Sequence, residues 1–161
     1  MERLFAPWRM EYIRSGGSGP EGCIFCDKPM EAGRRDNLLL YADDLTLVML
    51  NRFPYSNGHL LVVPRTHTAS LAALGPAEFE ALFRAVSRCV EILKAAFRPD
   101  GFNVGINLGR VAGAGIDQHL HVHVVPRWNG DTNFMPVLGE TKVISEHLLA
   151  TYDDLLPRFG H

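Results

Sequence analysis

Three histidines alternate with aliphatic residues in the last third of the chain, at His119, His121 and His123. Successive side chains of a β-strand point to opposite faces, so the three imidazoles are expected on one face, with Leu120 and Val122 on the other, against a core. The strand spacing puts neighbouring rings roughly 6–7 Å apart. Because imidazole titrates near neutral pH, such a row is suited to catalysis. The alternative is a set of solvated histidines on a half-buried strand.

The loop that leads into this strand is rich in glycine and alanine, over residues 109–115. Backbone N–H groups of a glycine turn approach an anion closely, as they do in phosphate-binding loops. Taken alone, the segment is equally typical of an ordinary turn. Next to the histidines it predicts a phosphate held beside an imidazole nucleophile, because neutral imidazole attacks at pH 7 without further activation. His121 is the best candidate for that attack, since it has a histidine on each side.

The elements that must position these residues are indicated by the spacing of apolar side chains. Helical spacing predicts one long helix at about Pro76–Phe97, which begins after Gly75 and ends at residues 98–101. Because the strands and the long helix come in blocks rather than as repeated β-α units, we expect an α+β fold with a mostly antiparallel sheet. The expected strands are 38–41, 45–50, 59–64, 102–108 and the histidine strand, and a terminal helix is expected over 145–156.

Composition places the chain among globular proteins of one domain. It has 161 residues and a formal net charge of −2, and 47% of its residues are hydrophobic. No basic excess indicates a nucleic-acid groove, and no apolar run of about 18 residues indicates a membrane span. The first residues lack the apolar stretch of a secretion signal. We therefore expect one cytoplasmic domain over residues 1–161, with an aromatic arm and a flexible segment in residues 1–20, and neither a nucleic acid nor a membrane as partner.

Two of the three cysteines form a Cys-x-x-Cys pair, Cys23 and Cys26. In a chain without a secreted disulfide framework this spacing indicates metal binding or redox chemistry, and no thioredoxin-like β-α pattern follows it. Tetrahedral zinc would need two further nitrogen or sulfur ligands. The third cysteine, Cys89, falls on the apolar face of the long helix and is expected to be a buried hydrophobic side chain.

The segment from His119 to Val125 matches in full the motif His-φ-His-φ-His-φ-φ, where φ is hydrophobic, and so resembles the histidine-triad (HIT) superfamily. Segments at residues 8–13, 101–109 and 125–134 resemble one branch of it, the bacterial diadenosine tetraphosphate phosphorylases. The resemblance covers most of the chain. It implies an antiparallel sheet of about five strands with one long helix and a C-terminal helix. It also implies a homodimer or higher homo-oligomer with a sheet continuous across the interface.

The resemblance implies roles for individual residues in nucleotidyl transfer from the α-phosphate of a dinucleoside polyphosphate. His121 corresponds to the nucleophile that becomes nucleotidylated, and His123 to a phosphate-binding histidine. In the phosphorylase branch the acceptor is inorganic phosphate, so diadenosine tetraphosphate would yield ADP and ATP. Further positions that match nucleotide-contacting residues are Asn51 at the ribose, Asn107 near the phosphates and Trp128, an aromatic residue typical of this branch.

One departure from the branch concerns the loop before the triad. The branch has Gly-Gly-Ser there, whereas this chain has Gly113, Ala114 and Gly115, so the serine hydroxyl that supports phosphate is absent. The Gly115 N–H could still serve, but water becomes an alternative acceptor. The protein would then be a hydrolase of dinucleoside polyphosphates or nucleoside phosphoramidates. His59, at the start of a strand, has either a supporting role near the nucleophile or a packing role.

A resemblance to zinc-containing bacterial members of the superfamily implies a Cys₂His₂ site made of Cys23, Cys26, His67 and His119. Such a zinc would be structural, with all four positions filled by the protein. The chemistry would then need no cofactor other than a magnesium ion carried by the substrate. The alternative for the two cysteines is a reduced thiol pair packed under the N-terminal arm.

Two other functions are compatible with parts of the sequence. A non-catalytic nucleotide-binding module would use the same pocket, although the intact triad argues against it. A redox or metal-carrier protein would use only the Cys-x-x-Cys pair. Arg127 could bind phosphate or form a salt bridge. The apolar residues that could line an adenine pocket, with core packing as the alternative, are Phe25, Leu50, Phe53 and Pro54.

Overall fold

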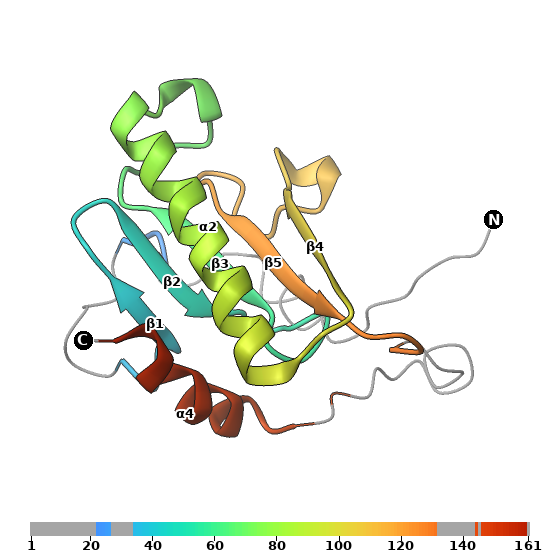
Figure 1. Ribbon diagram of the computed structural model, residues 1–161. Helices are drawn as coiled ribbons and strands as arrows, with labels where there is room; N and C mark the ends of the chain where they lie inside the picture. The colour runs from blue at the N-terminus through green and yellow to red at the C-terminus, as the bar shows by residue number, and fades with distance from the viewer. Residues whose placement is uncertain (1–21, 27–33, 132–143, 145, 161) are drawn as a thin grey trace.

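The computed structural model describes residues 22–26, 34–131, 144 and 146–160, and the arm expected at residues 1–20 lies outside them. Five strands form one sheet in the order β1-β2-β3-β5-β4, in which all neighbours are antiparallel (Figure 1). This is the α+β architecture that the sequence predicts. The strands are β1 at Leu39–Ala42, β2 at Thr46–Leu50, β3 at Leu60–Pro64, β4 at Gly101–Ile106 and β5 at Val122–Arg127.

Two α-helices cover one face of the sheet. The long helix α2, Pro76–Phe97, lies across β2, β3 and β5, and the C-terminal helix α4, Leu148–Phe159, packs against β1 and α2 (Figure 1). A short 3-10 turn at Leu71–Ala73 precedes α2. A second one, at Arg110–Ala112, lies in the connection from β4 to β5. No helix in the described part of the chain is long and apolar enough to cross a lipid bilayer.

Helix α2 begins and ends where its residue types predict. Gly75 caps it, Pro76 lies in the first turn, and the Glu78 carboxylate accepts the Gly75 N–H at 2.8 Å. The helix ends at Arg98, which has a left-handed conformation and donates its N–H to the Lys94 carbonyl. These local signals explain why the predicted range, 76–97, agrees with the structure.

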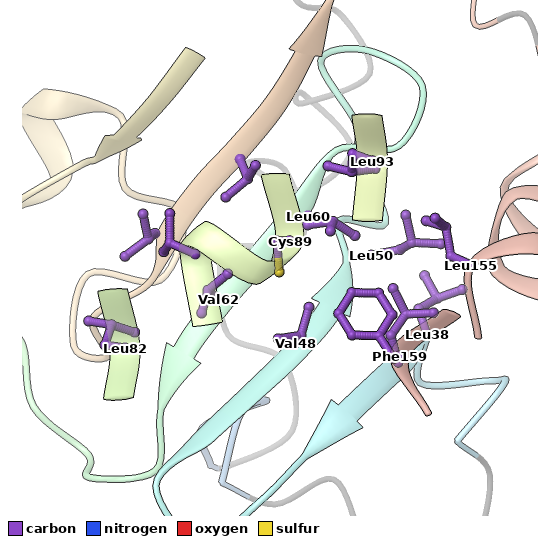
Figure 2. Close-up of a cluster of buried hydrophobic side chains, with 14 of the residues drawn as sticks. Leu38, Val48, Leu50, Leu60, Val62, Leu82, Cys89, Leu93, Leu155 and Phe159 are labelled. Carbon is purple, nitrogen blue, oxygen red and sulfur yellow. The ribbon is translucent and has the colours of Figure 1, made fainter. Parts of the chain in front are cut away.

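The main hydrophobic core lies between the helices and the sheet (Figure 2). Cys89 is fully buried there, and burial raises the pKa of its thiol to about 12, which confirms the predicted hydrophobic role. Leu120, Val122 and Val124 belong to the same core, as strand alternation predicts. The histidines between them therefore face the opposite side of the sheet.

A second, smaller apolar cluster lies on that opposite face. Its buried members are Phe25, Leu39, Leu47, Met49, Leu61 and Val63. Met49 pairs with Leu61 across β2 and β3, and Leu61 pairs with His123 across β3 and β5. Directly paired residues share a face, so this cluster forms an apolar floor beside the histidines.

The turn before β3 depends on a glycine. Gly58 has a φ of +72°, and a Cβ atom there would come within 3.1 Å of side-chain atoms of Leu93 and Phe97. Glycine adopts this conformation without steric cost and also permits the close approach to α2. The turn can therefore deliver His59 to the start of β3 in a fully buried position.

The ends of some elements differ from the predicted ranges by a few residues. β4 ends at Ile106 rather than at residue 108, and β5 begins at Val122, because these two residues form the last pair of their ladder. His121 consequently lies just before the strand, although its side chain keeps the alternating direction. Helix α4 begins at Leu148 and continues past residue 156, because its last turn buries Phe159 in the core.

Candidate active site and metal centre

His121 is buried and presents a single nitrogen for reaction. It is 5% exposed, and its Nδ1 lies 2.9 Å from the carbonyl oxygen of His119. A carbonyl oxygen only accepts, so Nδ1 carries the proton and Nε2 keeps its lone pair. Burial also lowers the pKa of His121, which favours the neutral ring near pH 7. A neutral imidazole with a lone pair on Nε2 is the form required for attack on phosphorus.

His123 lies beside His121 and is held by a further histidine. The ring centroids of His121 and His123 are 5.0 Å apart at an interplanar angle of 66°. They are closer than the roughly 6–7 Å of strand spacing because the rings lean together. His59 Nε2 lies 2.9 Å from His123 Nδ1. Of the two alternatives for His59, the structure therefore places this side chain in direct contact with the triad.

The two asparagines expected at the nucleotide lie next to these histidines. Asn51 Nδ2 is 3.4 Å from His59 Nδ1, and Asn51 Oδ1 accepts the Phe53 N–H at 3.0 Å. Asn107 Nδ2 is 3.5 Å from His123 Nε2. The structure thus brings one asparagine from the loop after β2 and one from the end of β4 to the histidines. Their contacts with ribose and phosphate stay predictions.

The loop between β4 and β5 turns tightly on itself before the triad. Gly109 and Gly113 have φ values of +81° and +89°, which this turn requires. The Gly113 N–H donates to the Arg110 carbonyl at 2.9 Å. The Ala114 N–H donates to the Gly109 carbonyl at 3.4 Å. Both amides are therefore hydrogen-bonded within the loop, and the Gly115 N–H stays the predicted donor to a phosphate.

Arg127 and Trp128 lie at the end of β5 away from the triad. Trp128 is five positions after His123, or about 16 Å along an extended chain, so their backbones lie well apart. The role of Trp128 at the nucleotide stays a prediction. Arg127 makes a two-point contact with Asp131, at 2.8 Å from Nη2 and 2.5 Å from Nε, and also donates to Asn103 Oδ1. Of the two alternatives for Arg127, the salt bridge is the one observed.

Cys23, Cys26, His67 and His119 converge on one point, as a shared metal ion would require. Their ligand atoms all lie within 4.8 Å of one another. Cys23 Sγ lies 3.2 Å from His119 Nδ1, and Cys26 Sγ lies 3.3 Å from His67 Nδ1. Zinc bonds of about 2.3 Å to sulfur and 2.0 Å to nitrogen imply a tetrahedral edge of roughly 3.5 Å. The group therefore has the donor atoms and the size that zinc requires.

His119 is oriented for such a site by its second ring nitrogen. Nε2 lies 2.9 Å from the carbonyl oxygen of Pro64, so Nε2 carries the proton and the lone pair of Nδ1 points at the sulfurs. Burial, and to a lesser degree the neighbouring His67 and His121, lower the pKa of His119. The lowered pKa of His119 favours the neutral ring, which is the form that binds a metal.

The candidate metal-binding group and His121, the predicted nucleophile, share one short segment. The His119 ring belongs to the metal-binding group, whereas the His119 carbonyl accepts the Nδ1–H of His121. Phe25 lies between the two cysteines in sequence and is 4% exposed. Its ring centroid lies 5.3 Å from that of His119 and 5.4 Å from that of His121. The contacts that hold His119 in place therefore also fix the tautomer of His121.

The apolar side chains near the site differ in part from those expected. Leu50 points into the core under α2 (Figure 2), so core packing is the alternative that the structure shows for this residue. Strand alternation is the reason, because Met49 and Leu61 occupy the histidine face instead. Sequence reasoning missed both, although the residue before Leu50 must face the opposite side. Phe25 does lie on the histidine face.

Tyr55 is another residue that sequence reasoning missed. Its N–H donates to His59 Nδ1 at 3.0 Å, and its ring centroid lies 4.8 Å from that of His59. The loop over residues 51–58 is rich in turn formers and has no periodic pattern, so no sequence signal pointed to this residue. Only the folded loop shows the contact.

Residues 32–130 of the chain match the HIT domain family. The chain is 37% identical over 158 residues to AP-4-A phosphorylase of Mycobacterium tuberculosis, and the match covers 94% of this chain and 80% of the relative. It is 34% identical over 109 residues to adenylylsulfatase HINT3 of Arabidopsis thaliana, and the match covers 68% of this chain and 54% of the relative. These relatives support an enzyme of the HIT type.

Solved structures with a similar fold include a Zn-bound histidine triad family protein from Mycobacterium smegmatis. It has a TM-score of 0.61 and 28% identity, and the match covers 76% of this chain and 83% of that one. A hypothetical histidine triad nucleotide-binding protein from Sulfolobus tokodaii has a TM-score of 0.65 at 24% identity, with 85% and 91% covered, and supports the fold alone. The family match spans more than half of the chain and contains the three triad histidines. The chain therefore belongs to the histidine-triad (HIT) family.

Proposed function

We propose that the protein is a nucleotidyl transferase that cleaves dinucleoside polyphosphates through a nucleotidyl-histidine intermediate. The observation that carries the proposal is the lone pair on Nε2 of the buried His121, beside His123 and an apolar floor. The apolar floor suits a nucleoside base, and the histidines suit its phosphates. The similarity to a protein named AP-4-A phosphorylase supports diadenosine tetraphosphate as substrate and inorganic phosphate as acceptor.

In the first step, His121 Nε2 attacks the α-phosphorus of diadenosine tetraphosphate. A P–N bond forms, the bridging P–O bond breaks, and ATP leaves with the bonding electron pair. In the second step, an oxygen of inorganic phosphate attacks the same phosphorus, the P–N bond breaks, and ADP leaves with His121 restored. The covalent intermediate divides one difficult transfer into two easier ones. His123 would stabilise the charge on the phosphoryl oxygens in both steps.

Water as acceptor is the second candidate, and the loop before the triad is the observation that favours it. Gly113, Ala114 and Gly115 offer no hydroxyl group, and the first two amides donate to carbonyls within the loop. Attack by water on the same intermediate would yield AMP and ATP. A non-catalytic nucleotide-binding module would form no intermediate.

Product analysis with and without phosphate distinguishes these candidates. With phosphate we expect ADP and ATP in equal amounts, and with ¹⁸O-labelled phosphate the label should appear in the β-phosphate of ADP. Without phosphate we expect a stoichiometric burst of ATP and then turnover slower by at least about tenfold, because the intermediate waits for its acceptor. Formation of AMP and ATP at the full rate without phosphate would establish the hydrolase instead.

We further propose that Cys23, Cys26, His67 and His119 hold a structural zinc ion. The protein would fill all four positions, so the ion would not contact the substrate. The similarity to a Zn-bound protein of the same family supports zinc over a redox role for the cysteines. A cytoplasmic location is part of this proposal, because a thiolate pair persists in a reducing compartment.

We propose a homodimer in which two chains meet along β4. This strand is at the edge of the sheet, and α2 covers β2, β3 and β5 but leaves it open (Figure 1). Val104 pairs with the buried Val124, so it points to the helix side, where it is 47% exposed. On α2, Phe79 and Phe83 are also exposed, with ring centroids 4.9 Å apart. Exposed apolar edges of this kind favour association.

Light scattering after size exclusion checks the dimer. Wild-type protein is expected at about twice the chain mass of 17.9 kDa, and Val104→Lys is expected near one chain mass, because a buried lysine opposes pairing. Arg84→Ala, which changes an exposed ion pair on α2, is the control and should stay dimeric. A monomeric wild-type protein would contradict the proposal.

A further inference from the structure

Tyr55 contacts two histidines of the site from the loop between β2 and β3. Its backbone N–H donates to His59 Nδ1 at 3.0 Å. Its ring centroid lies 4.8 Å from that of His59 and 5.9 Å from that of His123, and the interplanar angle with His123 is 26°. Neither step of the proposed reaction assigns a role to Tyr55.

The backbone contact decides where the protons of two imidazoles lie. An N–H donor that faces Nδ1 requires a lone pair there, so His59 is neutral and carries its proton on Nε2. That proton points at His123 Nδ1, 2.9 Å away, which must then be the acceptor. His123 consequently carries its own proton on Nε2. The side-chain nitrogen of Asn107 lies 3.5 Å from that atom and would be a second donor, so the Asn107 amide must present its oxygen there, with the positions of O and N exchanged. His123 therefore presents a donor, and a phosphoryl oxygen is the group that such a donor fits.

The ring of Tyr55 keeps this arrangement in place. The half-buried ring packs against both imidazoles, so it restricts their rotation and keeps water from one side of the bond between them. The same packing holds the loop so that the Tyr55 N–H stays directed at His59 Nδ1. Aromatic contacts of this kind are worth about two- to tenfold in an equilibrium constant.

We infer that Tyr55 is a positioning residue that acts through His59 to keep the proton of His123 on Nε2. The kinetic part of this inference rests on the proposed function, because it concerns stabilisation of phosphoryl oxygens during nucleotidyl transfer. The structural part, the tautomer of two histidines, does not depend on any activity. The two parts can therefore be tested separately.

The structural test is ¹⁵N NMR of the histidine rings in the free, metal-loaded protein. In the wild type, and in the matched control Tyr55→Phe, we expect a protonated Nε2 and an unprotonated Nδ1 for both His59 and His123. In Tyr55→Ala we expect mixed tautomers for both rings. Tyr55→Leu, which keeps apolar volume without the flat ring, is expected to resemble Tyr55→Ala. Wild-type tautomers in both truncated variants would overturn the inference.

The kinetic test measures formation of nucleotidyl-histidine in single turnovers with diadenosine tetraphosphate. Tyr55→Ala is expected to slow this step by about tenfold with KM changed less than about twofold, whereas Tyr55→Phe stays within about twofold of the wild type. If Tyr55 acts through His59, adding Tyr55→Ala to His59→Gln costs little more than His59→Gln alone. Fully additive effects would overturn the inference. Absence of the intermediate in the wild type would instead defeat the proposed function and leave the NMR result standing.

Discussion

Replacing His121 with glutamine is expected to lower the turnover of diadenosine tetraphosphate by at least about 10⁴-fold. The reason is that His121 Nδ1 donates its proton to the His119 carbonyl, so the lone pair of the ring is on Nε2. This lone pair is the proposed nucleophile. Glutamine keeps much of the volume at this buried position but supplies no nucleophilic nitrogen. The fold should therefore survive the change while the covalent step does not.

Two measurements and one control variant separate loss of the nucleophile from loss of the site. Acid-quenched protein labelled with radioactive diadenosine tetraphosphate should carry label in the wild type and none in His121→Gln. Calorimetric binding of a non-cleavable analogue should stay within about threefold, because the apolar floor and the asparagines remain. Arg84→Ala, on the helix side of the sheet, should keep both turnover and labelling. Labelled protein or near-normal turnover in His121→Gln would show that another group attacks.

Removing the metal site is expected to have the second-largest effect, on stability and on the reaction together. Cys23→Ser should reduce bound zinc from about one ion per chain to a small fraction, because a neutral hydroxyl replaces a thiolate ligand. The melting temperature is expected to fall by roughly 10 °C, as loss of several kcal/mol implies for a domain of this size. Turnover should fall as well, because the His119 carbonyl that holds His121 Nδ1–H belongs to the same segment.

The matched control for this variant is Cys89→Ala. It also removes one thiol, but Cys89 is a residue of α2, buried in the core between the helices and the sheet, and is not part of the metal-binding group, so zinc content should stay at the wild-type level. Zinc is measured by atomic emission, and stability by thermal unfolding with and without a chelator. A chelator should lower the melting temperature of the wild type toward that of Cys23→Ser and leave the variant unchanged. An unchanged zinc content in Cys23→Ser would reject the proposed ligand set.

The proposed reaction type rests on the order of residues because its signal is local. Alternation along a strand places His121 and His123 on one face whatever the rest of the chain does, and the structure confirms the opposite burial of Leu120 and Val122. The long helix was predictable for the same reason, since its cap, its apolar spacing and its end lie within one continuous segment. The resemblance to the HIT superfamily, which the family match confirms, extended these local signals to one antiparallel sheet of about five strands, whereas the order of the strands comes from the structure.

The sequence left alternatives open where a residue can face either of two apolar environments. The sequence left an adenine pocket and the core open for Leu50; this residue packs in the core under α2, and Met49, its neighbour, takes the face of the histidines. Both faces of the sheet are apolar at β2, so hydrophobicity alone did not distinguish them. Only the pairing of β2 with β3 and of β3 with β5 assigns each side chain to a face.

The three triad histidines are equivalent in the motif, and tertiary contacts make them different. His119 Nδ1 turns to a cysteine 96 residues away, and His123 Nδ1 turns to His59, 64 residues away. His121 Nδ1 instead binds the chain's own backbone two residues back, which leaves Nε2 for chemistry. A local pattern can place imidazoles in a row, but the position of each proton depends on the acceptor or donor that faces the ring. For His119 and His123 those partners come from distant segments, so the folded chain, and not the motif, distinguishes the three rings and supports the proposed roles of nucleophile, phosphate ligand and metal ligand.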